Sequence, residues 1–137
     1  LPAEARVKID FRLVPKMNPK KQAMRLKRHL RSKGFGDIEI KIYHGESAAR
    51  TNPKHAFVSV VTDAARKSFG KYLLSISSAG TGPMHAFTNI LKAPAIAIGS
   101  THVFSRIHSP NEFTRIDLLK KATKCMCLIL DNFARSN

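Results

Sequence analysis

Hydrophobic and polar residues alternate along the first segment of the chain. Apolar side chains occupy every second position from Val7 to Leu13, with polar side chains between them. A period of two residues is typical of a half-buried strand, and Pro15 marks its end. The alternation returns at residues 38–42, where isoleucine fills every second position. The pattern therefore predicts two strands, at 7–13 and 38–42.

A helix is predicted between these two strands. Asn18 is a favourable capping residue, Pro19 suits the first helical position, and Gly34 supplies a stop. An apolar stripe at helical spacing lies between these signals and consists of Ala23, Leu26 and Leu30. Residues 5–43 are therefore predicted to form a strand–helix–strand unit, which is too small to stand alone and should complete its sheet with another segment or a second copy.

The rest of the chain alternates predicted helices and strands. After a loop at residues 44–53, the pair Asn52-Pro53 predicts the start of a helix that ends at Gly70. Strands are predicted at 73–76 and 95–98, the second of the kind buried in a parallel sheet, with a short helix at 84–91 between them. A long amphipathic helix follows, with an apolar stripe made of Ile116, Leu119, Ala122, Met126 and Ile129. This order of elements indicates an α/β fold.

The charge changes the range of expected partners. The chain carries 24 Lys and Arg residues against 9 Asp and Glu, for a net charge of +15. Such a basic domain favours a polyanion such as nucleic acid, although a solvated surface, or an acidic remainder outside this chain, explains the charge equally well. Aromatic residues make up only 7% and Trp is absent, which argues against base stacking. The densest run of charge lies on the first predicted helix and comprises Lys20, Lys21, Arg25, Lys27, Arg28, Arg31 and Lys33.

Cysteine usage and hydropathy indicate the compartment. Cys125 and Cys127 point to roughly opposite faces of the last predicted helix, so no disulfide joins them, and a reducing cytoplasm is expected. No apolar run approaches the roughly 20 residues of a membrane span. The chain begins with Leu1 rather than Met, from which we expect a processed or excised piece.

Three stretches carry most of the chemical signal. They are Asp10-Phe11-Arg12-Leu13-Val14-Pro15, Ser78-Ala79-Gly80-Thr81-Gly82-Pro83 and His108-Ser109-Pro110-Asn111-Glu112. In this order and spacing they resemble the C-terminal part of the zinc metallopeptidase family of aminoacylases, glutamate carboxypeptidases, carnosinases and succinyl-diaminopimelate desuccinylases. The resemblance runs from about Ala5 to Phe133.

The resemblance implies roles for individual residues. His108 matches the last metal-ligating histidine, which binds one of two bridged zinc ions, and Glu112 matches a group that orders the ligand loop. Without this context, a lone loop histidine is more often a surface residue than a ligand.

A substrate-binding set is implied in the same way. Arg12 matches an arginine of the lid domain that holds a substrate carboxylate or carbonyl, and its fork geometry suits that task. Thr81 matches a small hydroxyl residue in a turn that meets the substrate, while Gly80 and Gly82 leave main-chain amides accessible. The pattern alone favours an exposed strand residue over a binding residue at Arg12, and Ser77–Gly82 fits an ordinary turn without a ligand.

The resemblance also implies an architecture and an activity. Residues 1–45 match the second half of a βαβ lid, or dimerisation, domain, and residues 46–137 match the C-terminal part of an α/β catalytic domain. The implied enzyme is a metal-dependent hydrolase of terminal peptide or N-acyl amide bonds, with two zinc ions when complete and a homodimer joined through the lid.

The chain departs from this family in its upstream part. A His-x-Asp motif, a bridging aspartate and a Glu-Glu pair are expected before the lid, and none of them precedes Leu1. The general base is therefore absent from this chain, and one histidine does not hold two zinc ions. We expect this chain alone to be inactive and free of zinc, with a missing N-terminal half as its partner. The alternatives are a basic nucleic-acid-binding module and a non-catalytic oligomerisation remnant.

Overall fold

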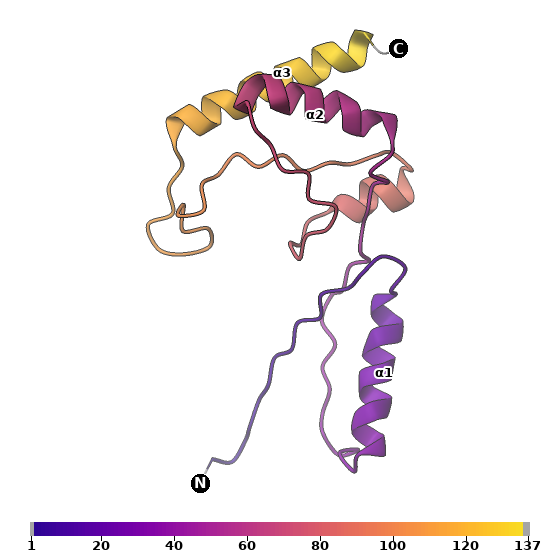
Figure 1. The fold of residues 1–137 in the computed structure, drawn as a ribbon. Helices are drawn as coiled ribbons and strands as arrows, with labels where there is room; N and C mark the ends of the chain where they lie inside the picture. The colour runs from indigo at the N-terminus through magenta and orange to yellow at the C-terminus, as the bar shows by residue number, and fades with distance from the viewer. Residues whose placement is uncertain (1, 136–137) are drawn as a thin grey trace. The chain divides into compact units, whose positions relative to one another are not determined.

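The computed structural model describes residues 2–135, in which the regular elements are helices (Figure 1). They are α1 (Pro19–Ser32), α2 (Ala56–Phe69), a short π-helix η1 (Ala86–Ile90) and α3 (Ile116–Arg135). The chain divides into two contact units. Unit 1 contains the residues up to Arg50 together with Ala79–Ala93, and unit 2 contains Thr51–Ser78 and the residues from Pro94 onward. The domains predicted at 1–45 and 46–137 stay a prediction.

The α/β fold class predicted from the sequence, a βαβ lid followed by an α/β catalytic domain, is wrong for the described residues. None of the segments 7–13, 38–42, 73–76 and 95–98 is a strand, and no backbone hydrogen bond joins any of these four segments to another. A strand exists only when a neighbour completes its ladder of hydrogen bonds. Alternation identifies a chain able to pair, but it does not supply the pairing partner.

Unit 1 is organised around α1. The Asn18 side chain accepts a hydrogen bond from the Lys21 backbone N–H at 3.1 Å, and Pro19 opens the helix, so the predicted start is confirmed. Gly34 has a φ of +87°, a conformation that suits glycine just past a helix end. The extended segments on either side of α1 both run opposite to the helix direction (Figure 1). This is the path of a βαβ unit without its sheet.

Within the described part of unit 1, residues 2–50 and 79–93, no residue is buried. The apolar face predicted for the first strand lies in solvent, and Val7 leaves 84% of its surface exposed. The segment after α1 returns to the start of the helix. Gly45 lies against Pro19, so close that a Cβ built on Gly45 would be 3.0 Å from Pro19 Cβ. Local signals therefore hold α1, with little help from burial.

Unit 2 holds the hydrophobic core, which is built where α2 packs against α3. Ala64 of α2 and Cys125 of α3 are fully buried, and Phe57 meets Phe133 edge-on with ring centroids 5.9 Å apart. Around the core lie half-buried apolar residues that include Ile96 and Ile98. The apolar segment 95–98, which was predicted as a strand, therefore packs on the core formed by α2 and α3.

The start of α2 differs from the prediction. The helix begins at Ala56, and its cap is His55, whose Nδ1 accepts the Phe57 backbone N–H at 3.1 Å. The Asn52 side chain instead accepts the Lys54 N–H at 3.0 Å and closes a turn one step earlier. The predicted stop at Gly70, with φ +77°, is confirmed.

The buried face of α3 is also displaced from the predicted stripe. Ile116, Leu119 and Met126 are exposed. The buried or half-buried positions recur at helical spacing and are Leu118, Ala122, Cys125, Leu128, Ile129 and Asn132. Apolar residues surround much of this helix, so the position of its partner α2 decides which of them are covered.

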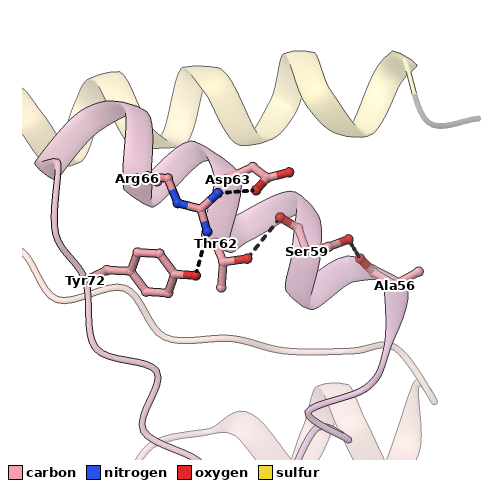
Figure 2. A network of polar contacts seen from close by, with 6 residues as sticks. All are labelled: Ala56, Ser59, Thr62, Asp63, Arg66 and Tyr72. Atoms are coloured by element: carbon pink, nitrogen blue, oxygen red, sulfur yellow. Dashed lines mark hydrogen bonds and ion pairs between the residues drawn. The ribbon is translucent and has the colours of Figure 1, made fainter.

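The outer side of α2 carries a polar network (Figure 2). Arg66 lies 3.5 Å from an Asp63 carboxylate oxygen and donates a hydrogen bond to the Tyr72 hydroxyl at 3.3 Å. Its guanidinium also stands over the Tyr72 ring, 5.6 Å from the centroid. These contacts tie the segment after α2 to the helix.

Two further sequence predictions can be compared with the structure. Cys125 is buried and Cys127 is exposed, and both are free thiols, which confirms the absence of a disulfide. No helix among residues 2–135 has the length and apolar character needed to span a bilayer.

Candidate functional site

The structure brings two of the predicted site residues together in unit 1. Nη1 of Arg12 donates a hydrogen bond to the Thr81 hydroxyl, although 69 positions separate the two residues in the sequence. Arg12 lies on the extended segment before α1, and Thr81 lies in the irregular, glycine-rich segment before η1, where the predicted turn at Ser77–Gly82 does not form. This contact brings together the first and second of the three sequence motifs.

A third side chain, which the sequence analysis did not assign to the site, completes this group. Nη2 of Arg12 is 2.9 Å from a carboxylate oxygen of Asp10, and both side chains are more than half exposed. Residues two apart on an extended segment share a face, so the Asp10-x-Arg12 spacing was the available signal. The carboxylate aligns the guanidinium and also occupies part of its donor fork.

The segment that holds Thr81 leaves open space beside it. A Cβ built on Gly82 would meet only Met84 Cγ, at 3.9 Å, and Gly82 has an ordinary negative φ. The backbone shape therefore does not require glycine at this position. The absence of a side chain leaves room for a molecule beside the segment. Gly80 lies in the same segment, on the other side of Thr81.

A cluster of one carboxylate and two imidazoles also lies in unit 1. Glu46 has His44 Nε2 3.7 Å from one of its oxygens and His85 Nδ1 3.7 Å from the other. The Nδ1 atom of His85 is shielded from solvent and has no hydrogen-bond partner. Neither His85 nor Glu46 belongs to the three motifs that the sequence offered.

His108 lies in unit 2, in an exposed loop before α3. Its backbone N–H donates to a Glu112 carboxylate oxygen at 3.4 Å, so Glu112 closes the loop that presents the imidazole. Arg106, His108 and Asn111 all have positive φ, between 55° and 62°. Asn and His adopt this conformation more readily than most residue types, so the backbone strain in the loop falls mainly on Arg106.

Ser105 anchors this loop to unit 2. It is 1% exposed, and its hydroxyl accepts the His102 backbone N–H at 3.0 Å while its carbonyl accepts the Phe113 N–H at 3.2 Å. A buried serine thus fixes both ends of the segment that carries His108. Arg12 and Thr81 belong to one unit and His108 with Glu112 to the other.

Comparison with known families decides the relationship. The family model described as Peptidase family M20/M25/M40 matches residues 3–132. The chain belongs to this peptidase family. The match confirms the broad family that the three motifs suggested, and with it the hydrolase class of metallopeptidase type. Searches of curated proteins and of solved structures returned no match.

The M20/M25/M40 peptidase chain does not by itself fit a zinc centre. Among residues 2–135, no group of three or more His, Cys, Asp or Glu side chains is arranged to hold a metal ion. This includes the neighbourhood of His108, where the Glu112 carboxylate accepts a hydrogen bond from the His108 backbone N–H. Protein zinc sites need three or four ligands, so one imidazole is too few.

Proposed function

We propose that this chain is one part of a metal-dependent hydrolase that cleaves a terminal peptide bond or an N-acyl amide bond. It contributes the groups that hold the substrate carboxylate, Arg12 and Thr81, and a single metal ligand, His108. The observation that carries the proposal is the family match over residues 3–132 together with the Arg12–Thr81 contact.

The chemistry of this pair suits a carboxylate. A guanidinium offers five N–H donors in a planar fork, and the Thr81 hydroxyl both donates and accepts. A substrate carboxylate that approaches Arg12 replaces the Asp10 carboxylate at Nη2, while Thr81 keeps its place at Nη1. Asp10 therefore positions the arginine until the substrate arrives.

The metal part of the proposal rests on another polypeptide segment. In the complete site His108 is one ligand, Glu112 holds its loop, and the remaining ligands and the general base come from an N-terminal half. We assign no hydrolytic step to this chain alone, and we expect it to bind no zinc by itself. The proposed assembly is a cytoplasmic homodimer joined through residues 1–45.

The carboxylate site is testable on the 137-residue chain. An N-acetyl amino acid and its C-terminal amide are titrated by NMR, and we expect only the acid to shift the Arg12 and Thr81 signals. Arg12→Gln should weaken binding by roughly 10- to 100-fold, the range for one hydrogen bond to a charged group. Arg6→Gln, which removes an arginine paired only with Glu4, is the matched control. Equal binding of acid and amide would contradict the assignment.

The metal ligand needs the complete protein. In the full assembly that carries the other ligands, His108→Ala should lower zinc content and hydrolysis of N-acyl amino acids together. His102→Ala changes a histidine in the same loop and should leave the zinc content unchanged. Full zinc occupancy in His108→Ala would reject the ligand role while leaving the carboxylate site standing.

A further inference from the structure

Helix α1 concentrates positive charge that nothing in the described chain neutralises. Its 14 residues include six Lys and Arg and no acidic residue. Residues 2–135 show no ion pair, side-chain hydrogen bond or cation–π contact for any of these six side chains. In unit 2, by contrast, Arg66 of α2 and Arg135 of α3 pair with Asp63 and Asp131.

The six cations share one side of the helix. At about 100° per residue, they fall within roughly half of the circumference, opposite the apolar stripe. One row is formed by Lys21, Arg25 and Arg28, and a second row by Lys20, Lys27 and Arg31. The rows extend about 17 Å along the axis at 1.5 Å per residue, a length over which duplex DNA carries about ten phosphates.

We propose that this cationic face of α1 docks on the phosphate backbone of duplex nucleic acid without reading its sequence. The proposal is independent of the hydrolase function, because it uses no residue of the carboxylate or metal sites. Phosphate contacts from Lys and Arg position a protein on a duplex and carry no base information. Apart from His29 the helix has no aromatic ring, so it offers no stacking platform for single-stranded bases.

The disposition of apolar residues disfavours a membrane as the partner. An interfacial helix inserts an exposed apolar face beside its cations. In α1 the apolar stripe of Ala23, Leu26 and Leu30 is half-buried within unit 1, and Met24, 58% exposed, is the large apolar residue left in solvent. Met24 lies between the two cationic rows, four positions from both Lys20 and Arg28, but a single exposed apolar side chain is far smaller than the face that such helices insert into a bilayer.

The test measures binding of the full 137-residue chain to a fluorescent 20-base-pair duplex of random sequence by anisotropy across salt concentrations. If all six side chains meet phosphates, log K should fall with log salt at a slope of about −5. The triple substitution Lys21→Gln, Arg25→Gln and Arg28→Gln should reduce that slope by about 3. Between about 50 and 200 mM salt, the variant should then lose about 40-fold less affinity than the unmodified chain.

A matched control carries Lys120→Gln, Lys121→Gln and Lys124→Gln on the exposed side of α3. It has the same net charge as the first variant, and its salt slope should stay close to that of the unmodified chain. Glutamine is a good helix former, and far-UV circular dichroism checks both variants. As a second measurement that needs no variant, amide shifts on adding duplex should map to α1.

Four outcomes overturn the proposal. These are no duplex binding at low salt, affinity that salt does not change, equal loss in both triple variants, and shifts that map away from α1. Vesicles rich in phosphatidylserine provide the competing arm at the same ionic strength. Binding to vesicles that is tighter than binding to duplex, and lost in the α1 variant, would assign the face to a membrane.

Discussion

The two units of this chain differ in what holds them. All five buried hydrophobic side chains among residues 2–135 belong to unit 2, on α2 and α3, whereas unit 1 has no buried residue. Unit 1 nevertheless carries Arg12, Thr81 and the most cationic helix. Its helix is set by an asparagine cap, a first-turn proline and a glycine stop, while the helices of unit 2 are set mainly by the surface they bury on each other.

This difference separates folding from binding. Burial of apolar surface is the main source of stability, so unit 2 should dominate the unfolding transition of the chain. Exposed charged side chains pay little for desolvation and contribute little stability, which leaves those of unit 1 available to other molecules. The following predictions test this division, beginning with the largest effect.

The largest loss should come from the core of unit 2. Ile129→Ala removes a side chain that is 6% exposed and leaves a cavity against α2, which should lower the free energy of unfolding by about 2–5 kcal/mol. Urea denaturation followed by circular dichroism measures it. Leu130→Ala, at a neighbouring position that is 68% exposed, should cost under about 0.5 kcal/mol. Similar losses in both variants would mean that the helix pair is not the core.

A smaller loss should follow from one hydroxyl in unit 2. Thr51 Oγ1 donates to the Ala95 carbonyl at 2.7 Å and accepts the Ala95 N–H at 2.9 Å. These are the two backbone groups that a neighbouring strand would otherwise pair. Thr51→Val keeps the shape but leaves both groups unpaired, at a cost of about 1–3 kcal/mol.

Hydrogen exchange at Ala95 provides the measurement, and its amide should exchange faster in Thr51→Val. Thr62→Val removes an exposed hydroxyl that donates to the Ser59 carbonyl at 3.1 Å. That control should leave the free energy of unfolding within about 0.5 kcal/mol. Unchanged Ala95 exchange in Thr51→Val would show that the segment is held by Ile96 and Ile98 alone.

The helix of unit 1 should respond to its cap. Asn18→Ala removes the acceptor for Lys21 N–H and should destabilise α1 by about 1 kcal/mol, which NMR chemical shifts report as lost helix at residues 19–32. The urea midpoint of unit 2 should stay unchanged. Asn18→Asp, an equally good cap, should keep the helix. A loss of unit 2 stability in Asn18→Ala would show that the two units unfold as one.

Sequence patterns identified the helices better than the strands. Asn18, Pro19, Gly34 and Gly70 act within one turn of the helix they delimit, so their effect is readable locally. A strand depends on a partner that the pattern cannot identify, and residues 7–13 remain without one, all but Leu13 exposed. A long amphipathic helix was predicted where α3 lies, but its buried face was predicted only in part, because apolar residues such as Ile116 and Leu119 lie outside the face that α2 covers.

The candidate site was predictable only where a motif supplied it. Arg12, Thr81 and His108 came from a resemblance, and the contact between the first two required the fold. The ion pair between Asp10 and Arg12 could have been predicted, because residues two positions apart on an extended segment lie on the same face. Glu46 and His85 lie 39 positions apart in the sequence and share no motif, so only the structure could bring them together.

The smallest effect concerns how the helices of the two units begin. The first turn of α3 contains Asp117, whereas the first turn of α1 contains no acidic residue. Arg115 donates two hydrogen bonds to Asp117, at 3.0 and 2.8 Å, and these lower the pKa of that carboxyl below its ordinary value of 3.8. An anion at a helix start is also stabilised by the helix dipole.

The direction of the pH dependence follows from this lowered pKa. A carboxyl that ionises more readily in the folded state stabilises it fully above its unfolded pKa, and this contribution disappears as pH falls through the lowered folded value. The first turn of α3 should therefore loosen in acid below about pH 3.8. In an NMR titration, Arg115→Gln should raise the pKa of Asp117, while Lys120→Gln, a cation on the same helix, should shift it less. If the Asp117 pKa is the same in Arg115→Gln and in the unmodified chain, the ion pair does not form in solution. The start of α3 would then resemble that of α1 in having no ion pair in its first turn.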